Sequence, residues 1–245
     1  MICPKCGFEQ AEGGVECARC GIVFAKVGRT PARRRKDPQP SARDAPPPAP
    51  EQTAPQAEAT LPVIALVPVL LILLYFSWRV IPSSLASNAA GHSFMHRINL
   101  PFHEAGHVFF RFFGRFMHSL GGSLGQLLMP LICFVALKYK TRDDFGAAVC
   151  LWWFGENLVD MAPYMNDARS LALPLLGGNF GYSAPYGFHD WQFLLTESGL
   201  LRYDHALART SHLIGASLML AGIAWGSALM MRRWKAERRS PRREG

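Results

Sequence analysis

Two long apolar stretches frame most of the chain. The first covers 61–81 and the second covers 206–231, and each is uncharged through most of its length. A helix needs about 20 apolar residues to cross the hydrocarbon core of a bilayer. We therefore expect both stretches to be membrane-spanning helices.

Three further apolar segments lie between these spans, at about 98–117, 120–138 and 145–164. Each is shorter than the two spans or carries charged side chains, which a helix facing lipid tolerates poorly. We therefore predict a mostly α fold, with a polytopic helical membrane domain that contains about 4–5 apolar segments.

Charge sets an expectation for the topology. Basic residues gather between Lys26 and Arg43 and again after Met231, and such flanks mark the cytoplasmic side of a membrane protein. Two cytoplasmic termini require an even number of crossings, whereas five apolar segments give an odd number. One segment is therefore expected to be re-entrant or to lie in the interface.

The segment 120–138 is the best candidate for the re-entrant piece, because three glycines and Pro130 interrupt its first half. Glycine and proline are the residues that most often break a helix. The alternative is that the loop 166–205 contains a half-span.

Composition agrees with a membrane protein: 49% of the 245 residues are hydrophobic and only 18% are charged, with a net charge of +8. Basic clusters beside apolar spans also attract anionic lipid headgroups. A nucleic-acid surface is the alternative, but the basic runs lack interleaved aromatic residues. We expect an integral protein of the cell inner or plasma membrane, with the lipid bilayer as a partner and no nucleic acid.

Composition also sets the expected domain boundaries. Residues 1–27 form a compact module, and 28–60 form a linker whose eight prolines cannot build a core. The membrane domain follows at 61–231. The tail at 232–245 carries seven basic residues and is expected to be unstructured.

The N-terminal module contains two Cys-x-x-Cys pairs, Cys3 with Cys6 and Cys17 with Cys20, and a glycine follows each pair. Four thiolates at this spacing are typical of a tetrahedral structural zinc site, and the module resembles a zinc ribbon. So short a segment has no adequate apolar core, so metal binding must supply its folding energy. A redox dithiol is the alternative, which two matched pairs disfavour. Ribbons of this kind bind proteins or nucleic acids, and the ribbon itself does not choose between them; the expected partner is a cytoplasmic protein.

The sequence His-Glu-Ala-Gly-His at 103–107 is the most specific chemical signal in the chain. On a helix, His103 and His107 share one face and can bind one zinc ion, while Glu104 can act on the metal's water as general base. Phenylalanines cover the opposite face. The alternative interpretation is therefore an amphipathic helix at the membrane surface.

A catalytic zinc site requires a third protein ligand. Glu156, Asn157, Asp160 and Tyr164 share one helical stripe, and carboxylates at membrane depth normally face a cavity, a partner or a metal. Asp160 is our first candidate.

Other residues compete with Asp160 for that role. The loop that follows offers three rivals, which are Asp167, His189 and Asp190. Asp160 or Glu156 could instead pair with an arginine that follows the HExxH motif, Arg111 or Arg115.

The HExxH motif in an apolar setting resembles the membrane-embedded zinc metalloproteases of the site-2 protease class. The resemblance implies that His103 and His107 are zinc ligands, that Glu104 is the general base, and that a later membrane helix supplies an aspartate as third ligand. Substrates of that class are membrane-anchored proteins. The family's third-ligand aspartate precedes a glycine, whereas this chain has no Asp-Gly pair.

The leading hypothesis is thus an intramembrane zinc metallopeptidase that cleaves membrane-anchored proteins. The second hypothesis is a non-catalytic membrane scaffold whose zinc ribbon binds a partner. A metal transporter or sensor that uses the same His and Asp cluster is a third.

Overall fold

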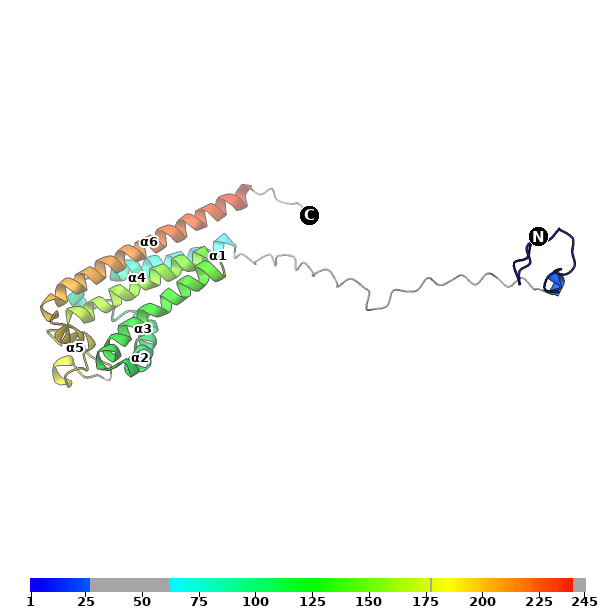
Figure 1. Ribbon diagram of the computed structural model, residues 1–245. Coiled ribbons are helices and arrows are strands. Elements are labelled where there is room, and N and C mark those ends of the chain that lie inside the picture. Colours follow the sequence, from blue (N-terminus) through cyan, green and yellow to red (C-terminus); the bar gives the residue numbers. More distant parts are fainter. Residues whose placement is uncertain (27–61, 177, 240–245) are drawn as a thin grey trace. The chain divides into compact units, whose positions relative to one another are not determined.

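A computed structural model describes residues 1–26, 62–176 and 178–239 (Figure 1). The segment expected to be a linker, 28–60, lies outside the described residues. The chain divides into two units, one at the N-terminus and one helical, and each is considered by itself. The described residues contain α-helices and short helical turns but no β-strand.

The described part of the N-terminal unit, residues 1–26, contains two similar loops. Isolated antiparallel bridges join Ile2 to Glu9 in the first loop and Glu16 to Val23 in the second. Both loops turn at a glycine with positive φ, Gly7 and Gly21, directly after a Cys-x-x-Cys pair. That conformation is open to glycine without strain, which explains the residue at this place.

The described residues of the helical unit form six α-helices, which are α1 (Val63–Val80), α2 (Phe94–Phe110), α3 (Arg115–Val135), α4 (Asp144–Asn166), α5 (Asp190–Glu197) and α6 (Asp204–Arg239). Within the part of the chain that the structure describes, three helices are long and apolar enough to cross a membrane: Val63–Val80, Arg115–Lys140 and Leu201–Arg239. The two outer spans expected from the sequence are confirmed as helices of this kind. The number of crossings is a separate question.

Helix α4 is the most buried element. Its backbone approaches α6 closely, because a Cβ placed on Gly155 would lie 2.6 Å from the carbonyl oxygen of Gly215. Nearby, Trp152 is almost fully buried and donates a hydrogen bond to Ser77 of α1 over 2.8 Å. Neighbouring helices therefore shield the polar side chains of α4 from the surroundings.

The helices α1, α3, α4 and α6 alternate in direction along the chain (Figure 1). The start of α4, at Phe145, packs with Leu70 of α1 and lies near Gly226 late in α6. The end of α4, at Met161, packs with Ala208 early in α6. The beginning of α1 and the end of α6 consequently lie at the same end of the helical unit.

The expectation that 120–138 is re-entrant is wrong, because the segment belongs to a continuous helix from Arg115 that extends through a π-helical turn to Lys140. Its glycines are contact points rather than breaks. A Cβ on Gly121 would meet the carbonyl oxygen of Gly106 at 2.6 Å. Small residues let two helices approach in this way, and α2 is the helix that packs against α3.

Two other expectations require correction. The segment expected at 98–117 is two elements, since α2 ends at Phe110 and Gly114, with φ of 94°, separates it from α3. The basic tail is not unstructured throughout, because α6 continues to Arg239. Residues 240–245 lie outside the described part of the chain.

Candidate metal centres

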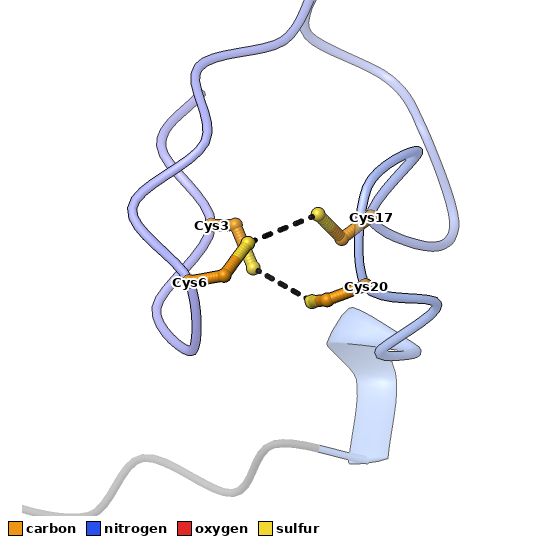
Figure 2. A group of neighbouring side chains, drawn as sticks. All are labelled: Cys3, Cys6, Cys17 and Cys20. Carbon is orange, nitrogen blue, oxygen red and sulfur yellow. Dashed lines mark hydrogen bonds between the residues drawn. The ribbon is translucent and has the colours of Figure 1, made fainter.

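The four N-terminal cysteines converge on one point (Figure 2). The sulfur atoms of Cys3 and Cys20 are 3.7 Å apart, as are those of Cys6 and Cys17. A tetrahedron with Zn–S bonds of about 2.3 Å has sulfur–sulfur edges of roughly 3.8 Å. The four cysteines could therefore bind a metal ion, and the spacing is consistent with a structural zinc site.

The surroundings of these thiols favour metal binding over a packed core. Burial opposes ionisation of Cys3, but the backbone amides of Lys5 and Cys6 stabilise its thiolate and lower its pKa to about 6. The backbone of Phe8 favours the Cys6 thiolate, but burial and the other three cysteines raise the pKa of Cys6 to about 12. Ile2 and Val15 are largely exposed, so little apolar surface is buried in the described part of this unit. Metal ligation is thus the main interaction available to hold it together.

Removing this metal is expected to unfold the N-terminal unit while the helical unit stays intact. A strong chelator should make all four N-terminal thiols reactive towards a thiol reagent, because ligation is the main interaction that holds these loops together. The helical signal in circular dichroism should persist. Thiols that stay protected after chelation would contradict the assignment.

A second group of potential ligands lies in the helical unit. His103 and His107 of α2 direct their Nε2 atoms towards Asp190, the first residue of α5. The Asp190 Oδ2 atom is 3.4 Å from Nε2 of His103 and 3.3 Å from Nε2 of His107. One ligand atom from each residue lies within 4.8 Å of the other two. Two imidazole nitrogens and one carboxylate oxygen form a donor set that suits zinc.

The other ring nitrogen of each histidine faces a hydrogen-bond acceptor. Nδ1 of His107 lies 2.7 Å from the carbonyl oxygen of His118, so this nitrogen carries the proton. Nδ1 of His103 lies 3.1 Å from Oε1 of Gln126. Both Nε2 atoms therefore keep their lone pairs for a metal, an arrangement that is common where histidines bind metal ions.

The carboxylate of this group is held in its ionised form. Burial would raise the pKa of Asp190, but the imidazoles of His103 and His107 beside it lower it below the ordinary value. The backbone N–H of Asp190 also donates to the Tyr164 hydroxyl over 3.0 Å. The end of α4 thus fixes the start of α5 beside the two histidines.

Glu104 lies between the two histidines in sequence and is half-buried. Its carboxylate makes no hydrogen bond to any residue in the described ranges, in contrast to Asp160 and Asp190. A carboxylate without a fixed partner beside a metal site is free to accept a proton from water.

Asp160, the first candidate for third ligand, does not join the two histidines in the structure. It accepts hydrogen bonds from Asn99 over 3.0 Å and from Gln126 over 2.9 Å, and it pairs with His96 at 2.9 Å. Gln126 stands between Asp160 and His103. The geometry therefore favours Asp190, which the sequence offered only as a rival.

The other two rivals support the loop that leads to Asp190. His189 is buried and caps α5, because its Nδ1 accepts a hydrogen bond from the backbone of Gln192. Burial opposes ionisation of Asp167, but the His189 ring 3.4 Å away, a hydrogen bond from Ser170 and two backbone amides lower its pKa. Neither side chain belongs to the group of three ligand atoms.

The alternative ion pairs are also absent among the described residues. Arg115 donates to the carbonyl oxygen of Tyr186 and lies over the ring of Phe193. Arg111 lies over the ring of Phe112. Neither arginine pairs with Asp160 or Glu156. Asp160 pairs with His96, and Glu156 accepts one hydrogen bond from Asn99 through Oε2.

Sequence reasoning missed two residues of the centre. Gln126 had no signal, since one glutamine in an apolar segment follows no pattern. Gly122 lies against the two imidazoles. A Cβ on it would be 2.5 Å from Nε2 of His103 and 2.6 Å from Nε2 of His107. Three glycines within five positions are the available signal, although backbone propensity alone favours helix breaking there.

Comparison of the chain with models of protein families, with curated proteins and with solved structures found no match. The geometry of its own residues is therefore the basis for any functional assignment.

Proposed function

We propose that the helical unit is an intramembrane zinc metallopeptidase that cleaves membrane-anchored proteins. The observation that supports this most is that the Nε2 atoms of His103 and His107 converge on the Asp190 carboxylate. Glu104 follows His103 in the chain, and its carboxylate has no hydrogen-bond partner among the described residues. This set leaves a fourth coordination position for water, which distinguishes a catalytic from a structural zinc site.

Each residue of the centre has a role in this proposal. Bound zinc would act as a Lewis acid on the scissile carbonyl and lower the pKa of the attacking water. His103, His107 and Asp190 would hold it. Glu104 would take a proton from the water and deliver it to the leaving amine, so the peptide bond breaks as water adds across it.

The surroundings of the centre indicate the class of substrate. Gly122, which lies against the two histidines, is seven residues from the start of α3 at Arg115. That places the centre about 10 Å along α3, a helix that is apolar enough to span a bilayer. A peptide bond must therefore reach the centre at or near membrane depth. Segments of membrane-anchored proteins meet this condition.

We further propose that α1, α3, α4 and α6 all cross the membrane. Four crossings would place both termini on one side, in agreement with their basic flanks, which favour the cytoplasmic side. Helix α4 carries carboxylates but is covered by its neighbours. The zinc centre would then open towards the non-cytoplasmic side, since α5 lies at the end of the bundle away from the start of α1 and the end of α6.

Substitution of Glu104 tests catalysis directly. Glu104→Gln in protein reconstituted into liposomes is expected to lower cleavage of a single-span reporter protein by on the order of 10²–10⁴-fold, which is the usual contribution of a general base. Zinc content, measured by mass spectrometry of the metal, should stay unchanged because Glu104 is not a ligand. Cleavage that survives this substitution would refute the proposal.

A non-catalytic scaffold is the second candidate, and one observation favours it. Ile2 and Val15 of the four-cysteine unit are 65% and 72% exposed, and exposed apolar side chains on a small module suit a protein partner. Under this alternative, wild-type protein would bind zinc in both centres and cleave nothing.

A further inference from the structure

A buried polar network lies behind the zinc centre and has no role in the mechanism above. It connects α2, α3 and α4 through Asn99, Gln126, Glu156 and Asp160, and each of these side chains is at least 95% buried. Buried polar groups among apolar helices are costly unless they are fully paired. We therefore expect this buried network to have a structural or functional role.

The hydrogen-bond directions in this network are determined by groups that can act in only one way. The Trp153 indole can only donate, so Oδ1 of Asn99 accepts from it over 2.9 Å. The Asn99 amide nitrogen then donates to Glu156 over 2.8 Å and to Asp160 over 3.0 Å. The amide nitrogen of Gln126 donates to the same Asp160 oxygen, Oδ2, over 2.9 Å, so both amides direct their N–H groups at this carboxylate.

The same logic extends from Gln126 to the metal centre. With its nitrogen facing Asp160, Gln126 presents Oε1 to His103, 3.1 Å from Nδ1. An amide oxygen only accepts, so Nδ1 must carry the imidazole proton. The lone pair of His103 is then on Nε2, the atom that faces His107 and Asp190. Gln126 in the opposite orientation would place the proton on Nε2 and block metal binding.

We propose that Asp160 is a positioning residue that fixes the tautomer of His103 through the orientation of Gln126. This inference rests on the proposed zinc site but concerns a different atom, the ring proton of His103. Its mechanism requires no contact between Asp160 and the metal. It also explains why a carboxylate that is not a ligand lies in the centre of the helical unit.

The isosteric substitution Asp160→Asn is the direct test. An amide can donate as well as accept, so Gln126 is free to turn and the proton of His103 is expected to move in part to Nε2. Imidazole ¹⁵N shifts of the histidine-labelled full-length protein, recorded without metal near pH 9, report the tautomer. Zinc affinity of the helical centre should fall by about 10–100-fold, the usual effect of losing a group that orients a metal ligand.

Two further variants separate positioning from structural damage. Gln126→Met removes the acceptor but leaves Asp160 paired with His96 and Asn99, and it should shift the tautomer in the same direction. Combining Asp160→Asn with Gln126→Glu restores an acceptor-only group beside His103 and should recover most of the lost affinity. Ser77→Ala is a matched control, since it breaks a buried hydrogen bond to Trp152 elsewhere in the bundle.

The outcomes distinguish this inference from the proposed function. A tautomer and zinc affinity that do not change in either Asp160→Asn or Gln126→Met would overturn the inference, as would a double variant no better than Asp160→Asn alone. A tautomer that shifts as expected in protein that never cleaves a substrate would support the inference and count against the peptidase.

Discussion

Asp190→Ala is expected to remove zinc from the helical unit and to abolish cleavage. A four-ligand zinc site contributes about 10–16 kcal/mol, so one protein ligand is worth roughly 3 kcal/mol, or about 10²-fold or more in affinity. Asp190 is also the group that faces both Nε2 atoms, at 3.4 and 3.3 Å. Its loss leaves only two ligands, both from α2.

The measurement is the zinc affinity of the full chain, with the four-cysteine unit already saturated so that the second site is read alone. Glu197→Ala is the control, because Glu197 ends the same short helix and contacts Tyr186 rather than the histidines. Equal affinity in Asp190→Ala and the wild type would show that the third ligand is another residue.

The comparison with Asp160 makes this result more specific. If Asp160 were the third ligand, Asp160→Asn would weaken zinc binding as strongly as Asp190→Ala. If Asp160 acts through Gln126, its substitution should have the smaller effect, and the combined change with Gln126→Glu should reverse it. The order of the two affinities therefore decides between the two aspartates.

The two histidines could be predicted from the sequence because their geometry is local. Residues four apart on a helix share a face whatever surrounds them, and α2 does form over His103 and His107. Asp190, in contrast, lies 87 positions after His103. Its place depends on how the loop after α4 folds back, which Tyr164 and Asp167 control through contacts that no periodicity reveals.

The sequence argument for Asp160 rests on burial, and burial has more than one explanation. Glu156, Asn157 and Asp160 of this stripe are buried and Tyr164 is half-buried, and burial of a carboxylate does require a partner. The partners of Asp160 are amides and an imidazole, from Asn99, Gln126 and His96. Composition alone cannot distinguish a carboxylate that pairs with amides and an imidazole from one that binds a metal. In either case the carboxylate lies among polar neighbours.

The glycines of α3 show that backbone propensity can also mislead a prediction from sequence. Backbone propensity at Gly121, Gly122 and Gly125 favours a break in the helix. In the structure, close approach to α2 outweighs propensity, because a side chain at Gly121 would collide with the backbone at Gly106. A helix partner was needed to make that distinction.

Gly122→Ala should disrupt the zinc centre without disrupting the fold. The added Cβ would lie 2.5 Å from Nε2 of His103 and 2.6 Å from Nε2 of His107, closer than a Cβ atom approaches a non-bonded heavy atom in proteins. These imidazoles end flexible side chains and can rotate away, but they then leave the position beside Asp190. We expect zinc affinity to fall as far as it does in Asp190→Ala.

The thermal stability of Gly122→Ala shows whether zinc binding is lost without loss of the fold. Alanine in a helix is favoured over glycine by about 1 kcal/mol, so thermal unfolding of metal-free protein should shift little. Gly226→Ala is the matched control, because its Cβ would meet side chains no closer than 3.3 Å, far from the histidines. Zinc should bind that variant normally. Normal zinc binding in Gly122→Ala would mean that the two histidines do not direct Nε2 towards α3, and the proposed centre would lose its geometric basis.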